Sequence, residues 1–109
     1  MIPGLSEKIN LQRVYDRIAI AIRSVDPSRN IGFEPVTWLQ SLKSGFSHPP
    51  GGMRFAEKSI FCYHFYTQNI LNKYKFTNEN YLEARHNDSL RLGTGGILTE
   101  FFITSEKGS

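Results

Sequence analysis

The sequence predicts an α/β protein in which short parallel strands alternate with helices. Two observations predict this class. Segments with helical periodicity alternate along the chain with short apolar runs, and a run that is apolar almost throughout is typical of a strand covered on both faces. The composition agrees, because 39% of the 109 residues are hydrophobic and 21% are charged, as in an ordinary folded domain.

The first predicted element is an amphipathic helix over residues 8–25. Its apolar residues recur close to every 3.6 positions, from Ile9 to Val25. The helix stops at Asp26, since Pro27 disfavours helical backbone in the residue before it. The apolar stripe is wide, so we expect this helix to pack on something large.

A short buried strand follows over residues 31–34, and Pro35 ends it because proline has no N–H for the ladder. Residues 39–52 then read as a loop rich in Ser, Gly and Pro. A long loop after a short strand is often functional.

The second half predicts a strand, a helix and a strand. Residues 59–66 are nearly all apolar or aromatic. A helix follows over residues 78–92, with Gly93 as its C-terminal stop. The third strand covers residues 97–99 and runs into Glu100. Three short strands and two helices cannot cover both faces of their own sheet, and both outer strands would be open edges, so the sheet is expected to be incomplete.

Polar or aromatic side chains stand at the end of each predicted strand: Glu34, then His64 and Tyr66, then Glu100. In (β/α)8 barrels the active site lies at the carboxyl ends of the strands. His64 and Tyr66 are two residues apart and therefore point to the same face. Two carboxylates with a His and a Tyr at one rim suit glycoside hydrolysis, which needs an acid and a nucleophile.

Other classes of function find little support. The net charge is +3 and the basic residues are scattered, so a nucleic-acid partner is not expected. Cys62 is the single cysteine, which excludes an internal disulfide and offers no set of metal ligands. No apolar run in the sequence has the length of a transmembrane helix.

A series of motifs adds a resemblance that runs almost the length of the chain. The motifs are Ile2-Pro3-Gly4-Leu5, Phe33-Glu34-Pro35-Val36-Thr37-Trp38, Gly45-Phe46 with Pro50-Gly51-Gly52, Ser59 to Tyr66 with its His-x-Tyr pair, and Gly95-Gly96-Ile97-Leu98-Thr99-Glu100-Phe101. In this order and spacing they resemble the later part of a family 5 glycoside hydrolase, and within it an endoglycoceramidase. The implied fold is an incomplete (β/α)8 TIM barrel, with residues 1–104 as its later part and 105–109 as a tail.

The resemblance implies roles for the candidate residues. Glu100 would be the nucleophile of a retaining mechanism, and Tyr66 would hydrogen-bond its carboxylate. His64 would line the same site. Glu34 would lie at the rim, where it could bind sugar hydroxyls or form an ion pair with an arginine. Trp38 would be a platform for sugar or ceramide.

The implied activity is cleavage, with retention, of the bond between oligosaccharide and ceramide in glycosphingolipids, without a metal or organic cofactor. The expected partner is a glycolipid or oligosaccharide substrate. Apolar loop residues such as Phe46 and Trp38 would suit a lipid, with peripheral contact to a lipid surface in the parent enzyme, and no protein partner is inferred. The resemblance implies a secreted or lysosome-like location.

The sequence contains no Asn-Glu-Pro, the family motif that carries the general acid/base, so the isolated chain is expected to be inactive. Three alternatives stay open. The chain could belong to another family 5 β-glycanase or glucosidase. It could be a small non-enzymatic α/β module that binds carbohydrate, or a basic α/β domain of unrelated function.

Overall fold

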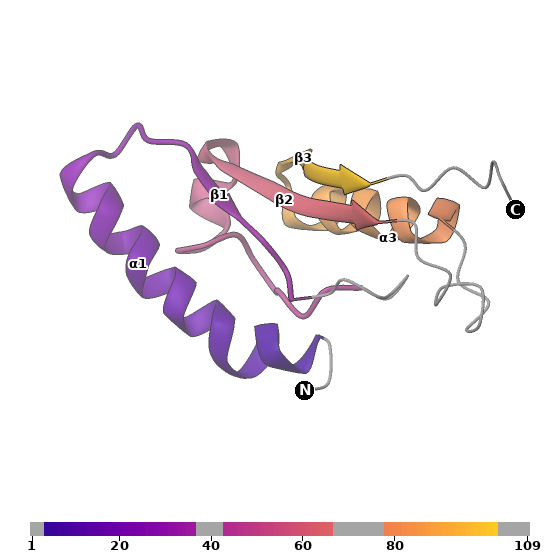
Figure 1. Ribbon diagram of the computed structural model, residues 1–109. Coiled ribbons are helices and arrows are strands. Elements are labelled where there is room, and N and C mark those ends of the chain that lie inside the picture. The colour runs from indigo at the N-terminus through magenta and orange to yellow at the C-terminus, as the bar shows by residue number, and fades with distance from the viewer. Residues whose placement is uncertain (1–3, 37–42, 67–77, 103–109) are drawn as a thin grey trace, which may run out of the picture.

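The computed structural model describes residues 4–36, 43–66 and 78–102 and confirms the α/β class. Its sheet has three parallel strands in the order β1-β2-β3, with α1 beside the edge strand β1 and α3 beside β2 and β3 (Figure 1). The elements are a π-helical segment η1 (Glu7–Leu11), α1 (Gln12–Val25), β1 (Ile31–Phe33), a 3-10 helix η2 (Met53–Lys58), β2 (Ser59–Tyr66), α3 (Asn78–Leu92) and β3 (Gly95–Phe102).

The predicted bounds of β2 and α3 are confirmed. Two differences concern the flanking elements. The first helix begins as a π-helical segment at Glu7, and β3 already starts at Gly95, so that both glycines expected to lead into the strand belong to it. The short helix η2 was not predicted. The expected tail at residues 105–109 lies outside the described residues.

The core lies on one face of the sheet. Phe33 and Phe61 are register partners in β1 and β2, and their rings meet edge to face at 5.4 Å. Phe46 packs against Phe33 in the same manner at 5.3 Å, and Leu92 of α3 completes the buried cluster. Phe46 is 1% exposed, so the expectation that it serves a lipid substrate is wrong; it is a core side chain.

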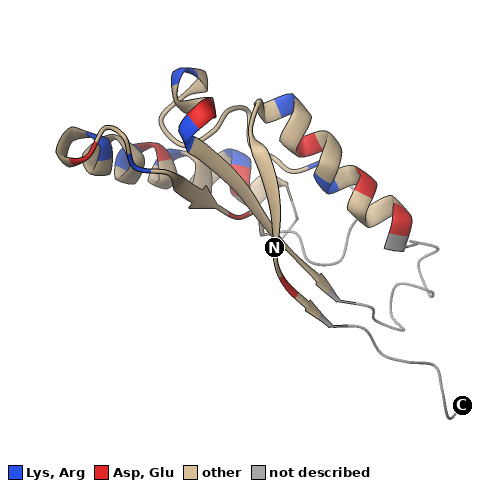
Figure 2. Cartoon of the chain, turned by 90° about the horizontal axis from the view of Figure 1, so that it is seen from above, with Lys and Arg blue, Asp and Glu red and all other residues tan. Residues whose placement is uncertain are grey.

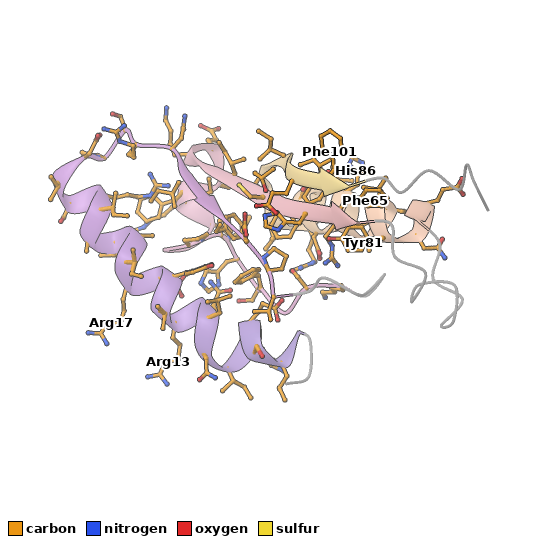
Figure 3. The ribbon with its side chains drawn as sticks, viewed as in Figure 1. Arg13, Arg17, Phe65, Tyr81, His86 and Phe101 are labelled. Carbon is orange, nitrogen blue, oxygen red and sulfur yellow. The ribbon has the colours of Figure 1, made fainter. Side chains whose placement is uncertain are left out.

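The buried face of α1 is not the apolar stripe that predicted the helix. Gln12, Ala19 and Arg23 are the buried residues of α1, and Arg13 and Arg17 project away from the sheet (Figure 3). Large apolar residues of the stripe remain in contact with water, with exposed fractions from 38% at Ile22 to 87% at Val25: Val14, Ile18, Ile22 and Val25. In the described part of the molecule, nothing covers this side of the helix.

Polar residues of α1 fix the starts of two strands and the loop between them. The guanidinium of Arg23 donates to the carbonyls of Arg29 at 2.8 Å and Lys58 at 2.9 Å, just before β1 and β2 begin. The carboxylate of Asp16 accepts the backbone N–H of Gly51 at 2.9 Å and contacts Nε2 of His48 at 2.9 Å. These bonds tie the loop between β1 and β2 to the helix.

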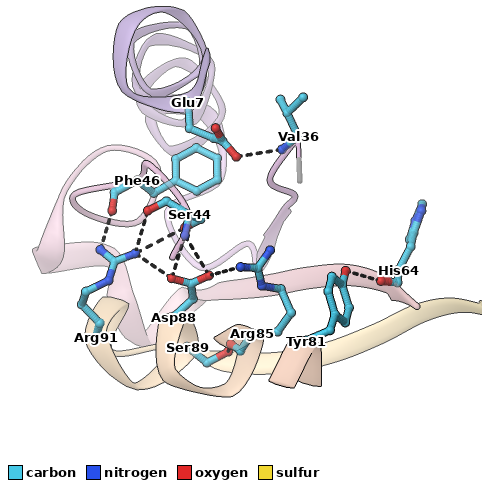
Figure 4. Close-up of polar contacts among 10 residues, drawn as sticks. All are labelled: Glu7, Val36, Ser44, Phe46, His64, Tyr81, Arg85, Asp88, Ser89 and Arg91. Carbon is cyan, nitrogen blue, oxygen red and sulfur yellow. Dashed lines mark hydrogen bonds and ion pairs between the residues drawn. The ribbon is translucent and has the colours of Figure 1, made fainter. Parts of the chain in front are cut away.

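A second polar anchor joins the same loop to α3 (Figure 4). The carboxylate of Asp88 is 1% exposed. It accepts the backbone N–H of Ser44 at 3.1 Å and contacts the guanidinium groups of Arg85 at 3.2 Å and Arg91 at 2.9 Å. Arg91 also donates to the backbone carbonyl of Phe46. The same cluster therefore holds the loop and the backbone of a core residue.

The sheet is incomplete within the described ranges. Its strands are parallel, α1 and α3 both lie on the side of the phenylalanine core, and β1 and β3 are its edges. This is the arrangement of a segment of a (β/α)8 barrel, in which helices cover the outside and strand ends carry the site. Within residues 4–36, 43–66 and 78–102, no helix has the length and apolarity needed to cross a membrane.

Candidate functional site

Glu34, His64 and Glu100 come together at the carboxyl ends of the three strands. Glu34 is the first residue after β1, and His64 and Glu100 are register partners in β2 and β3. Side chains alternate along a strand. Phe61, Tyr63 and Phe65 of β2 face the helices, so His64 faces the opposite, uncovered side.

A bulge in β3 places Glu100 on this side. Tyr63 pairs with Leu98 and His64 pairs with Glu100, so Thr99 is an extra residue that has no register partner in β2. In a regular ladder Glu100 would stand opposite Phe65, which packs on Tyr81 of α3 (Figure 3). The extra residue therefore turns the carboxylate from the helix side to the side of His64.

The imidazole of His64 lies between the two carboxylates. Its Nε2 is 3.3 Å from Oε1 of Glu34, and its Nδ1 is 3.5 Å from Oε2 of Glu100. The Glu100 side chain is 58% exposed and the Glu34 side chain 45%, so a ligand can reach both. Thr99 adds a hydroxyl 3.4 Å from the same Oε1 of Glu34.

Two tyrosines fix the backbone beneath this cluster. The hydroxyl of Tyr15 in α1 donates to the carbonyl of Glu34 at 3.4 Å, and that of Tyr81 in α3 donates to the carbonyl of His64 (Figure 4). Burial raises the pKa of both phenols. Both therefore stay protonated at neutral pH and remain hydrogen-bond donors.

Cys62 lies two residues before His64 on the same face of β2 and carries a free thiol. Burial raises the pKa of this thiol, and the charge of Glu34 raises it further. Because the thiolate is the nucleophilic form, Cys62 is a poor candidate for chemistry at neutral pH.

The candidate residues of the sequence fall into two groups. Glu34, His64 and Glu100 are brought together, although Glu34 meets a histidine rather than the arginine that was considered. Tyr66 follows in β2, but its side chain lies outside the described part of the structure, and Trp38 is outside the described residues altogether.

Sequence reasoning missed three contributors: Thr99, Tyr15 and Tyr81. The position of Thr99 next to Glu100 was a signal that could have been followed. Tyr15 falls within the apolar stripe of its helix, and no pattern in the sequence indicates that either tyrosine bonds to the end of a strand.

Two other types of site, a metal site and a positively charged surface on α3, find no support among the described residues. Within the three described ranges, no group of three His, Cys, Asp or Glu side chains could hold a metal ion. Acidic and basic residues are intermixed along α3 (Figure 2), so this helix presents no continuous positive surface.

The chain is similar to known proteins over nearly its whole length. The family model described as cellulase (glycosyl hydrolase family 5) matches residues 5–108. Similar curated proteins are an endoglycoceramidase of Hydra vulgaris, 41% identical over 102 residues, and one of Cyanea nozakii, 42% identical over 106 residues. These alignments cover 94% and 97% of the chain but 19% and 20% of the two relatives, so the chain spans about a fifth of their length. No solved structure gives a significant match.

Proposed function

The chain belongs to glycosyl hydrolase family 5, and we propose that it supplies the nucleophile, Glu100, of a retaining glycosidase. The observation that carries the proposal is the placement of Glu100. Its exposed carboxylate stands at the carboxyl end of a parallel strand, turned by a bulge away from the helices and toward His64. Strand ends of this kind carry the catalytic groups of (β/α)8 enzymes.

In the proposed reaction, a carboxylate oxygen of Glu100 attacks the anomeric carbon while the bond to the leaving-group oxygen breaks. A general acid gives its proton to that oxygen, and a glycosyl ester on Glu100 results. The same acid, now a base, then takes a proton from water, whose oxygen attacks the anomeric carbon and releases Glu100. We assign the acid/base role to a residue outside these 109 positions, because the sequence has no Asn-Glu-Pro.

The supporting residues are part of the same proposal. His64 lines the site beside Glu100, and Tyr66 hydrogen-bonds the nucleophile and keeps it ionised. Trp38 is a platform for the substrate. The supporting evidence is the contact of His64 with Glu100, together with the position of Tyr66 two residues further along the same strand.

The proposed substrate is a glycosphingolipid, cleaved between oligosaccharide and ceramide, and a lipid surface is the proposed peripheral contact of the parent enzyme. The support is the similarity to two endoglycoceramidases over nearly the whole chain. A different β-glycoside substrate within family 5 is the nearest alternative. A panel with one glycosphingolipid and one soluble β-glucan separates the two, since preference for the glucan would contradict the ceramide proposal.

The test is a chimera in which the matched segment of the Hydra endoglycoceramidase is replaced by the aligned residues of this chain. We expect it to hydrolyse a fluorescent glycosphingolipid. Glu100→Gln should lower kcat by about three orders of magnitude or more, because an amide cannot act as the nucleophile. Glu57→Gln, the same change at an exposed residue before β2, should leave kcat unchanged.

A trapping experiment identifies the nucleophile directly. A 2-deoxy-2-fluoro glycoside with a good leaving group should leave its sugar on the peptide that contains Glu100, as read by mass spectrometry. Label on another carboxylate, or full turnover by the Glu100→Gln chimera, would remove the nucleophile assignment. Binding of glycolipid without any cleavage by the unmodified chimera would favour a carbohydrate-binding module.

A further inference from the structure

The imidazole of His64 has a carboxylate on each side. Nε2 faces Glu34 at 3.3 Å and Nδ1 faces Glu100 at 3.5 Å. The two carboxylates come from the two strands that flank β2, so the ring spans the sheet from the end of β1 to the end of β3. The imidazole therefore connects the carboxylate of Glu34 to the carboxylate of Glu100.

The chemistry of imidazole makes the orientation of the ring matter. A neutral imidazole has one N–H donor and one acceptor nitrogen, an imidazolium has a donor at both nitrogens, and an ionised carboxylate only accepts. Only a ring with a hydrogen on both nitrogens can therefore donate to a carboxylate on each side, and a carboxylate that accepts the Nε2–H fixes the direction of the Nδ1–H. Contacts of 3.3–3.5 Å are long for hydrogen bonds, but catalytic contacts often shorten only when substrate binds.

Glu34 is itself held in place at three points. Its Oε1 lies 3.3 Å from Nε2 of His64 and 3.4 Å from the hydroxyl of Thr99. Its backbone carbonyl accepts the hydroxyl of Tyr15. Thr99 is the extra residue of the bulge and precedes Glu100, so Glu34 contacts both His64 and the backbone neighbour of the proposed nucleophile.

We propose that Glu34 is a positioning residue: it binds the Nε2 side of His64 and so directs the Nδ1 side onto Glu100. The inference rests on the proposed role of Glu100 as nucleophile. It differs from a role in binding sugar hydroxyls, which would act on the substrate directly. If Glu34 acts through His64, its removal has no further effect once His64 is gone.

The test uses the chimera and a double-mutant cycle. Glu34→Ala removes the contact, and Glu34→Gln keeps an oxygen that can accept the Nε2–H. We expect kcat to fall about tenfold in Glu34→Ala and less in Glu34→Gln, with KM within about twofold, as for a group that serves the transition state rather than ground-state binding. The rate of labelling by the 2-fluoro glycoside should fall in the same order.

The double-mutant cycle tests whether Glu34 acts through the imidazole of His64. His64→Gln should lower kcat at least as much as Glu34→Ala, and the double variant should be no slower than His64→Gln alone. Additive effects on kcat, or a rise in KM without a change in kcat, would overturn the proposal and assign Glu34 to direct binding of substrate.

A milder variant guards against a folding defect. Thr99→Val removes the hydroxyl near Glu34 and keeps the shape of the side chain. We expect a two- to threefold loss of kcat that disappears in the His64→Gln background, with thermal melting unchanged in both. An unchanged kcat in Thr99→Val or in Glu34→Ala would also refute the inference.

The failure of this inference can be told from the failure of the proposed function. If the Glu100→Gln chimera stays active, the proposed function fails. If that chimera is inactive while Glu34→Ala behaves as wild type, only this inference fails.

Discussion

At the scale of single residues, Asp88 shows how a buried charge fixes a loop. Its carboxylate meets the guanidinium groups of Arg85 and Arg91 and the N–H of Ser44. Removing one partner of such a cluster leaves the others buried without compensation. The loop that Asp88 holds carries Phe46, so the loss would also reach the core.

Asp88→Ala in the chimera should therefore lower the free energy of unfolding by about 3–5 kcal/mol. The measurement is the midpoint of urea denaturation followed by fluorescence. Glu83→Ala is the matched control, because Glu83 is an exposed carboxylate on the same helix, and its loss should change stability by less than about 0.5 kcal/mol. Equal midpoints for the two variants would contradict the anchoring role of Asp88.

The residues of the candidate site could be predicted in part. Glu34, His64 and Glu100 were expected together because the carboxyl ends of parallel strands meet at one edge. The contact of His64 with both carboxylates was not predicted, since it depends on the bulge at Thr99, and periodicity does not reveal a bulge.

At the scale of elements, the loop between β1 and β2 passes very close to the start of the first helix. A Cβ added at Gly45 would lie 1.7 Å from the carbonyl oxygen of Gly4. No side chain fits there, so this approach requires glycine. The contact fixes the loop segment from which Phe46 enters the core.

Gly45→Ala should push the loop away from the helix and lower the melting temperature of the chimera by several degrees, in line with a loss of about 2 kcal/mol or more. Differential scanning calorimetry provides the measurement. Gly95→Ala is the control, since a Cβ at Gly95 meets nothing within 4 Å. A Gly45→Ala chimera that melts with the control would show that the close approach is not needed.

Element prediction succeeded where local signals and burial agree. The strand at residues 59–66 is nearly all apolar or aromatic, and Gly93, with its φ of 69°, ends the helix over residues 78–92. The buried face of α1 could not be predicted, because Gln12 and Arg23 are buried by bonds to residues about 35 positions away, at Ser47 and Lys58. Hydrophobic periodicity ignores such partners.

At the scale of the whole molecule, the described sheet has two open edges and a helix with an uncovered apolar face. Open edges pair with other chains and exposed apolar faces associate. Both features would be covered in a closed barrel, where each strand has two neighbours.

The isolated 109-residue chain should therefore show no hydrolysis of a glycosphingolipid and only weakly cooperative thermal unfolding. Circular dichroism and an activity assay at high protein concentration provide the measurements, with the chimera as the active control. Robust turnover by the isolated chain, or a sharp two-state transition, would contradict the proposal that it needs the rest of a barrel.

The unpaired Thr99 also bears on how the gene can change. An in-frame deletion of one codon between Gly96 and Glu100 can be absorbed, because straightening the strand still leaves Glu100 opposite His64. A one-codon insertion there cannot be absorbed by straightening the strand. It requires a second bulge in β3, or else the Glu100 carboxylate turns toward α3. Descendants of this gene are thus expected to tolerate shortening of the segment more readily than lengthening, and two homologues can differ there by one residue while their carboxylates coincide in space.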